Sequence, residues 1–156
     1  MKIFKRIIGV LLLLFLLVQF FRPALNNGEV NAVLPFISET KPSKEIVNIF
    51  KTACFDCHSN ATNYPWYNKI TPLNFWMEDH IKEGKKELNF SEWSKYSIAR
   101  KEHKMEEVWE EVEQLKMPLE SYTWTHFDAK LSKEQINKLV VWAKEMQENY
   151  KNQLVN

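Results

Sequence analysis

The sequence predicts an all-α protein, and two observations support this fold class. Only three glycines occur among the 156 residues, which is too few for a loop-rich or turn-dense β architecture. Several segments repeat apolar residues at steps of three and four positions, which is the period of an amphipathic α-helix. The length normally corresponds to one folded domain.

The first element is an apolar segment near the N-terminus. Residues 7–21 are almost entirely apolar, and Lys2, Lys5 and Arg6 precede them. We therefore expect residues 1–22 to form a transmembrane helix whose basic end stays in the cytoplasm. A cleaved signal peptide is the alternative, although Gln19-Phe20-Phe21-Arg22-Pro23 supplies no small side chain for cleavage and the nearest acceptable pattern, Val30-Asn31-Ala32, lies far downstream.

The next two regions are a predicted tether and a predicted helical domain. Residues 23–42 contain Asn-Asn-Gly together with Pro35 and Pro42, which are typical of a linker. Residues 43–156 should form the folded domain. Its first two helices are expected over residues 44–52, after the cap Ser43, and from Thr71-Pro72 to Gly84. Two more are expected over residues 100–116 and from the capping box Ser132-Lys133-Glu134-Gln135 onward.

The strongest chemical signal is Cys54-Phe55-Asp56-Cys57-His58, a complete C-x-x-C-H sequence. This pattern is typical of covalent haem c attachment, because two thiols can each add to a haem vinyl group while the adjacent imidazole reaches the iron. The alternatives fit less well. A zinc site usually needs four ligands and the chain has only these two cysteines, whereas a thioredoxin-like dithiol needs a βαβ unit.

His58 is the predicted proximal ligand of the haem iron, and the distal side has three candidates. Met117 is the first, because Pro118 forces an extended backbone there and lets the thioether leave the preceding helix. His126 is the second, and a vacant distal position is the third. His80 is expected to hydrogen-bond a haem propionate if it is buried and to be an ordinary solvated residue if it is exposed. His103 is expected to be a solvated surface residue.

A longer set of residues accompanies the C-x-x-C-H sequence along the chain. The set comprises Gln19-Phe20-Phe21-Arg22-Pro23, Cys54 to His58, Tyr64-Pro65-Trp66-Tyr67, Pro72, Trp76, His80, Gly84, Asn89-Phe90-Ser91-Glu92-Trp93, Met117-Pro118, Tyr122, His126 and Leu131-Ser132. With these residues the sequence resembles a known family, the small bacterial haem-binding domains that are similar to c-type cytochromes and often carry an N-terminal membrane anchor. The resemblance implies covalent haem at Cys54 and Cys57, with His58 on the iron. One departure is Leu119, where such loops often have a second proline.

Together these features predict a cytochrome c-like helical domain around one covalent haem, which transfers single electrons between redox protein partners. Covalent haem attachment takes place outside the bacterial inner membrane, so we expect a single-pass protein there with a periplasmic haem domain. A haem sensor or peroxidase-like enzyme is the alternative function, and an electron carrier is not itself an enzyme. The formal net charge of +1 gives no basis for nucleic-acid binding.

Overall fold

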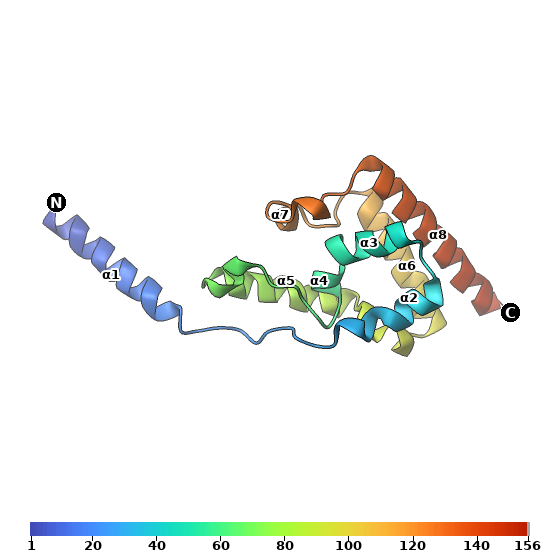
Figure 1. Cartoon of the computed structure of the whole chain (residues 1–156), viewed down its shortest axis with the longest axis horizontal. Coiled ribbons are helices and arrows are strands. Elements are labelled where there is room, and N and C mark those ends of the chain that lie inside the picture. The colour runs from blue at the N-terminus through green and yellow to red at the C-terminus, as the bar shows by residue number, and fades with distance from the viewer. Residues whose placement is uncertain (156) are drawn as a thin grey trace.

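The computed structural model describes residues 1–155, and the regular elements of this part of the chain are all helices joined by irregular segments (Figure 1). The described residues form no β-strand, and one isolated bridge pairs Asn27 with Ala61. The all-α prediction is confirmed. The elements are α1 Lys2–Val18, η1 Val30–Val33, α2 Leu34–Thr40, α3 Lys44–Ala53, α4 Phe55–His58, η2 Trp66–Lys69, α5 Leu73–Glu87, η3 Phe90–Lys95, α6 Ile98–Glu113, α7 Glu120–Thr123, η4 Phe127–Ala129 and α8 Lys133–Val155, where η denotes a 3₁₀ helix.

The core contains a cluster of aromatic rings contributed by four elements. Phe36 of α2 is fully buried and meets Phe50 edge to face, with ring centroids 5.2 Å apart. Phe90 and Trp93 of η3 pack on the same ring at 4.6 and 5.1 Å, and Trp142 of α8 approaches at 6.2 Å. Such edge-to-face pairs add about 1 kcal/mol each beyond the buried area. The cluster therefore joins α2, α3, η3 and α8, and α6 packs along α8.

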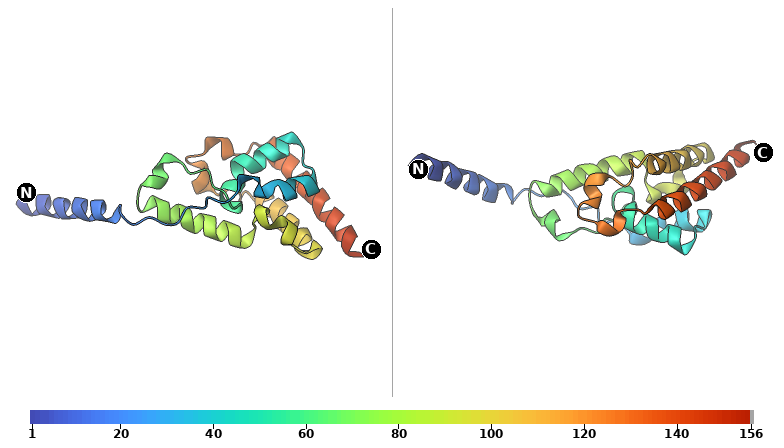
Figure 2. Two further views of the ribbon diagram at one scale, coloured as in Figure 1. Left: turned by 60° about the horizontal axis from the view of Figure 1, so that its bottom comes forward. Right: turned by 90° about the horizontal axis from the view of Figure 1, so that it is seen from above.

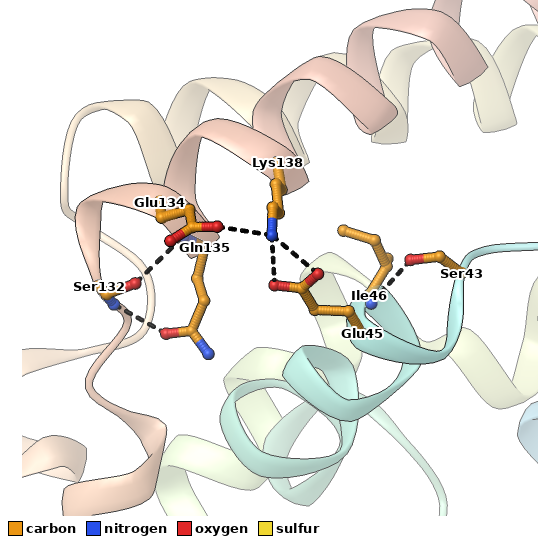
Figure 3. Close-up of polar contacts among 7 residues, drawn as sticks. All are labelled: Ser43, Glu45, Ile46, Ser132, Glu134, Gln135 and Lys138. Atoms are coloured by element: carbon orange, nitrogen blue, oxygen red, sulfur yellow. Dashed lines mark hydrogen bonds and ion pairs between the residues drawn. The ribbon is translucent and has the colours of Figure 1, made fainter.

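Three helices begin where the sequence predicts or close by. The Ser43 hydroxyl accepts a hydrogen bond from the Ile46 N–H at the start of α3. At the start of α8, the Gln135 N–H donates to Ser132 Oγ and the Ser132 N–H donates to Gln135 Oε1, which is a reciprocal capping box (Figure 3). The helix expected at residues 100–116 is α6, which starts two residues earlier after the cap Ser97.

Two helix ends differ from the prediction. Gly84 was expected to follow the end of its helix, but it lies inside α5, which continues to Glu87. The helix expected to reach residue 116 ends at Glu113, because Leu115 adopts a left-handed backbone with φ of 58°. Both differences affect the candidate site, as described below.

Residues 23–42, which we expected to form a tether, include two helical elements. Val33 of η1 and Phe36 of α2 are buried in the core. Before them, Asn26 is held by hydrogen bonds from its Nδ2 to Ser59 O and Thr62 Oγ1, both at 2.9 Å. This segment therefore packs against the folded part of the chain rather than standing away from it.

The prediction of an N-terminal transmembrane helix is wrong. No helix within residues 1–155 combines the length and the apolar character needed to cross a membrane. Helix α1 has 17 residues, which corresponds to about 25 Å against a hydrocarbon core of about 30 Å. The predicted single-pass location at the bacterial inner membrane depended on that anchor and falls with it.

Helix α1 projects away from the other helices in every view, and none of its residues is buried (Figures 1 and 2). Its exit is fixed by Gln19. The Gln19 amide exchanges two hydrogen bonds with the Thr71 backbone, donating to its carbonyl at 3.0 Å and accepting from its N–H at 2.9 Å. The chain therefore leaves α1 in contact with the residues that precede α5.

Candidate haem site

The C-x-x-C-H sequence occupies the junction between α3 and α4. Helix α3 ends at Ala53, and the Cys54 carbonyl accepts hydrogen bonds from the N–H groups of Cys57 and His58, at 3.2 and 2.9 Å. Residues three and four positions apart on such a turn are neighbours in space. The turn therefore keeps both thiols and the imidazole within one short structural unit.

A cavity of about 330 Å³ opens beside this turn and has mainly apolar walls. Cys54, His58 and Met117 all line it, so the structure brings together three of the four predicted haem-binding residues. Glu87, Glu107 and Glu111 also reach it. The other lining residues are Phe50, Ala53, Leu88, Phe90, Val108, Val112 and Leu139.

Cys57 lines a second, smaller cavity of about 40 Å³ rather than the main one. Leu119 and Tyr122, which follow Met117 in the chain, line this smaller cavity with Cys57 and with Asp56 of the same turn. Cys54 therefore lines the main cavity together with Met117, whereas Cys57 lines the smaller cavity together with Leu119 and Tyr122.

His58 is oriented by the backbone carbonyl of Leu88, which no sequence motif singles out. Its Nδ1 lies 2.9 Å from Leu88 O, and because a carbonyl can only accept, Nδ1 must carry the hydrogen. The neutral ring then presents Nε2 with a free lone pair, which is the form that binds a metal. Burial lowers the pKa of His58 and so favours this neutral form at pH 7.

Both cysteines are free thiols that are partly buried. Burial, followed by the influence of Cys57, raises the pKa of Cys54 to about 12. Burial, followed by the negative charge of Asp56, raises the pKa of Cys57 to about 11. Both groups are therefore protonated near neutral pH. Within residues 1–155 no three His, Cys, Asp or Glu side chains are grouped so that they could hold a metal ion.

Gly84 allows α5 to lie directly against the C-x-x-C-H turn. A Cβ atom at this position would be 2.8 Å from the Cys57 carbonyl oxygen and 3.2 Å from Cys57 Cβ. Real Cβ atoms essentially never come so close to a backbone oxygen. A glycine within a helix often marks such a close approach, and this was the available signal for its role.

Met117 reaches the cavity through the irregular backbone that follows α6. After the left-handed Leu115, the N–H groups of Lys116 and Met117 both donate to the Glu111 carbonyl, at 2.9 and 3.0 Å. These bonds hold the backbone of Met117 against the last turn of α6. Met117 therefore lies outside α6, which ends at Glu113.

The alternative ligand His126 is not among the residues that line the main cavity. Its ring stacks on Tyr122 with centroids 4.0 Å apart and an interplanar angle of 11°. His80 lies on α5 beside Trp76 and lines the smaller cavity. His103 is exposed between Glu106 and Glu107, as expected for a surface residue.

Two functional candidates were missed in the sequence, Asp56 and Tyr122. The Tyr122 hydroxyl donates to Asp56 Oδ2 at 2.8 Å, and the Asn63 N–H donates to Asp56 Oδ1 at 3.0 Å. Asp56 was visible only as a variable position between the cysteines. Tyr122 belonged to the family resemblance, but nothing in the sequence paired it with Asp56.

The site also fits the chemistry of haem. An apolar cavity between helices can enclose a flat macrocycle, and an oriented neutral imidazole faces the same space as a thioether and a thiol. Fold and site together define an all-α protein with an apolar cavity beside a C-x-x-C-H turn.

Comparison with known proteins places the chain in a family. The sequence model of the haem-binding domain matches residues 13–145, which is most of the chain. The chain therefore belongs to the haem-binding domain family. No curated protein and no solved structure matches it.

Proposed function

We propose that this protein holds one haem c covalently through Cys54 and Cys57, with His58 and Met117 as the axial ligands of the iron, and that it transfers single electrons to and from redox protein partners. The observation that carries the proposal is the main cavity, where Cys54, His58 and Met117 meet although Met117 is remote in sequence. Membership of the haem-binding domain family supports the choice of cofactor.

Attachment at the two cysteines is an addition reaction. Each thiol would add across one vinyl group of haem, so that sulfur would bond to one vinyl carbon and the hydrogen to the other. Nothing would be released, and the addition itself would need no external oxidant or reductant.

The chain's own residues would hold the cofactor and set its environment. His58 is kept in one tautomer by Leu88, and the apolar walls limit water at the cavity. The bound haem would supply reversible one-electron chemistry, and His/Met ligation favours a raised reduction potential. A filled distal position favours electron transfer over reaction with small ligands.

A second candidate function is a haem sensor or peroxidase-like enzyme with an open or labile distal site. The carboxyl groups of Glu107 and Glu111 favour it, because both residues line the cavity beside Met117. Acidic groups there could exchange protons with a bound ligand. Ligand binding by the ferrous protein separates the two candidates.

The test uses the full chain produced together with a haem-attachment system. We expect haem to remain on the protein after denaturation and to be lost from the Cys54→Ala, Cys57→Ala double variant. We also expect ferrous wild-type protein to bind carbon monoxide slowly and Met117→Ala to bind it within the mixing time. Rapid binding by the wild type would contradict the electron-carrier proposal and favour the second candidate.

A further inference from the structure

Asp56, one of the two residues between the cysteines, makes contacts on three sides. Asp56 Oδ1 accepts from the Asn63 N–H at 3.0 Å, and Asp56 Oδ2 accepts from the Tyr122 hydroxyl at 2.8 Å. Its carbonyl oxygen accepts from Thr62 Oγ1 at 2.6 Å. The carboxylate is therefore held in one orientation by the chain on either side of it.

Tyr122 connects the Met117 segment to the C-x-x-C-H turn. It lies on α7, five positions after Met117. Its hydroxyl reaches Asp56 and also lies 3.4 Å from the Thr52 carbonyl near the end of α3. One side chain thus spans from the proposed distal side of the cavity to the element that carries the proximal ligand.

Few other polar contacts hold this segment. Apart from the two contacts of Tyr122, residues 118–126 make one further side-chain hydrogen bond to a different element of the described chain. It joins Thr125 Oγ1 to Tyr67 Oη at 2.8 Å and is exposed. The contact of Tyr122 is partly buried, and the stacked ring of His126 supports the orientation of Tyr122. Hydrogen bonds to a charged acceptor are stronger than neutral ones.

The donor in this contact stays protonated. Burial, followed by the negative charge of Asp56, raises the pKa of Tyr122 above its ordinary value. The hydroxyl therefore remains a donor throughout the pH range in which the protein would work, and the contact is not lost by ionisation of the phenol.

We propose that the Tyr122–Asp56 hydrogen bond positions the distal ligand by fastening the Met117 segment to the C-x-x-C-H turn. The inference rests on the proposed function, since it takes Met117 as the ligand opposite His58. Tyr122 and Asp56 are then positioning residues that act through Met117. Their contact sets how often the thioether leaves the iron and admits another ligand.

The test compares Tyr122→Phe with the wild type as full-length haem-loaded proteins. This substitution removes one oxygen atom and leaves the ring that stacks on His126. We expect carbon monoxide to bind the ferrous variant about tenfold faster, because loss of a hydrogen bond to a carboxylate shifts the open form by about that factor. The near-infrared absorption spectrum of the ferric protein gives a second measurement. Its long-wavelength band, which is typical of Met-ligated haem iron, should weaken in the variant.

Tyr150→Phe is the matched control. Tyr150 also donates to a carboxylate, Glu39 Oε1 at 2.7 Å, but this contact joins α8 to α2 and involves no residue near Met117. It should lower stability to a similar extent while leaving the carbon monoxide rate and the band unchanged. General loosening of the fold would instead affect both variants alike.

A double-mutant cycle with Asp56→Ala tests whether the two residues act as a pair. If they act through their mutual bond, the double variant should be no faster in carbon monoxide binding than the faster single variant. Rates for Tyr122→Phe equal to those of Tyr150→Phe and the wild type would overturn the inference. A wild-type protein without the Met band would instead reject the proposed function, so the two failures are distinguishable.

Discussion

Gly84 illustrates how a single residue shapes the site without taking part in its chemistry. Its lack of a side chain lets α5 approach the Cys57 carbonyl, and a Cβ there would sit 2.8 Å from that oxygen. The same approach brings the end of α5 near His58, whose Nδ1–H donates to Leu88 just beyond that helix. The close spacing between α4 and α5 therefore helps to set the orientation of the His58 ring.

We predict that Gly84→Ala destabilises the protein by about 2 kcal/mol, because the backbone must shift to admit the methyl group. Denaturant titration measures the loss, and haem content after attachment should fall with it. Gly9→Ala is the control, since a Cβ at Gly9 meets no atom within 4 Å. Equal stability of the two variants would show that α5 does not lie this close to the motif.

At the scale of elements, helix starts are set locally and brought together by a few long-range contacts. The capping box of α8 lies beside the start of α3, and Lys138 of α8 pairs with Glu45 of α3 (Figure 3). Both ends of this pair are exposed, so it contributes little energy by itself. The caps are the larger local contribution.

We expect Ser132→Ala to cost about 1 kcal/mol of stability, because it leaves the first turn of α8 without its side-chain acceptor. Thermal or denaturant unfolding measures the change. Ser94→Ala, on the exposed surface of η3, is the matched control and should be nearly neutral. A neutral Ser132→Ala would mean that packing alone fixes the start of α8.

The elements also show which features a sequence can specify. Ser43 and the Ser132 box signal α3 and α8 through local chemistry, and the apolar period over residues 100–116 signals α6, so these helices were predictable apart from their exact ends. The burial of Phe36 was not, because nothing local distinguishes a linker from a short helix covered by distant aromatic rings.

The candidate site likewise contains residues that the sequence could predict and contacts that it could not. Cys54, Cys57 and His58 form a contiguous motif, and Met117 is marked by the proline after it. The Leu88 carbonyl and the Tyr122–Asp56 contact depend on residues far apart in the chain, so no local pattern reveals them. The anchor was mispredicted because apolar composition alone did not show that α1 ends at Val18, where Gln19 pairs with Thr71.

At the scale of the whole molecule, a buried ionic contact joins α2, α6 and α8. The Lys101 ammonium lies 2.8 Å from both oxygens of Glu39, and Tyr150 donates to the same carboxylate. Lys101 is almost completely buried, with a side chain 8% exposed. The buried ammonium of Lys101 is therefore compensated by the Glu39 carboxylate. Through these contacts Glu39 links α2 to α6 and α8.

We predict that Glu39→Ala lowers stability by about 2 kcal/mol, because it leaves the Lys101 charge buried without its partner. Denaturant unfolding at pH 7 measures it. Glu45→Ala removes a comparable pair in which both side chains are exposed, and should cost under about 1 kcal/mol. Equal effects would indicate that Lys101 finds another partner or reaches solvent.

The same contact should show a pH dependence. Burial opposes ionisation of Glu39, but hydrogen bonds from Lys101 and Tyr150 outweigh it, so its pKa in the folded protein lies below the ordinary 4.5. A lowered carboxyl pKa adds stability that is present above the unfolded value and is lost as pH falls through the folded one. The difference between wild type and Glu39→Ala should therefore shrink below pH 4.5.

The most direct test of the whole molecule is the near-infrared absorption spectrum of the ferric full-length protein, with Met117→Ala beside it. We expect covalently held haem to show the long-wavelength band of His/Met-ligated iron in the wild type and to lose it in the variant. A high-spin spectrum without the band, or a band that persists in Met117→Ala, would contradict the assignment of Met117 as the distal ligand.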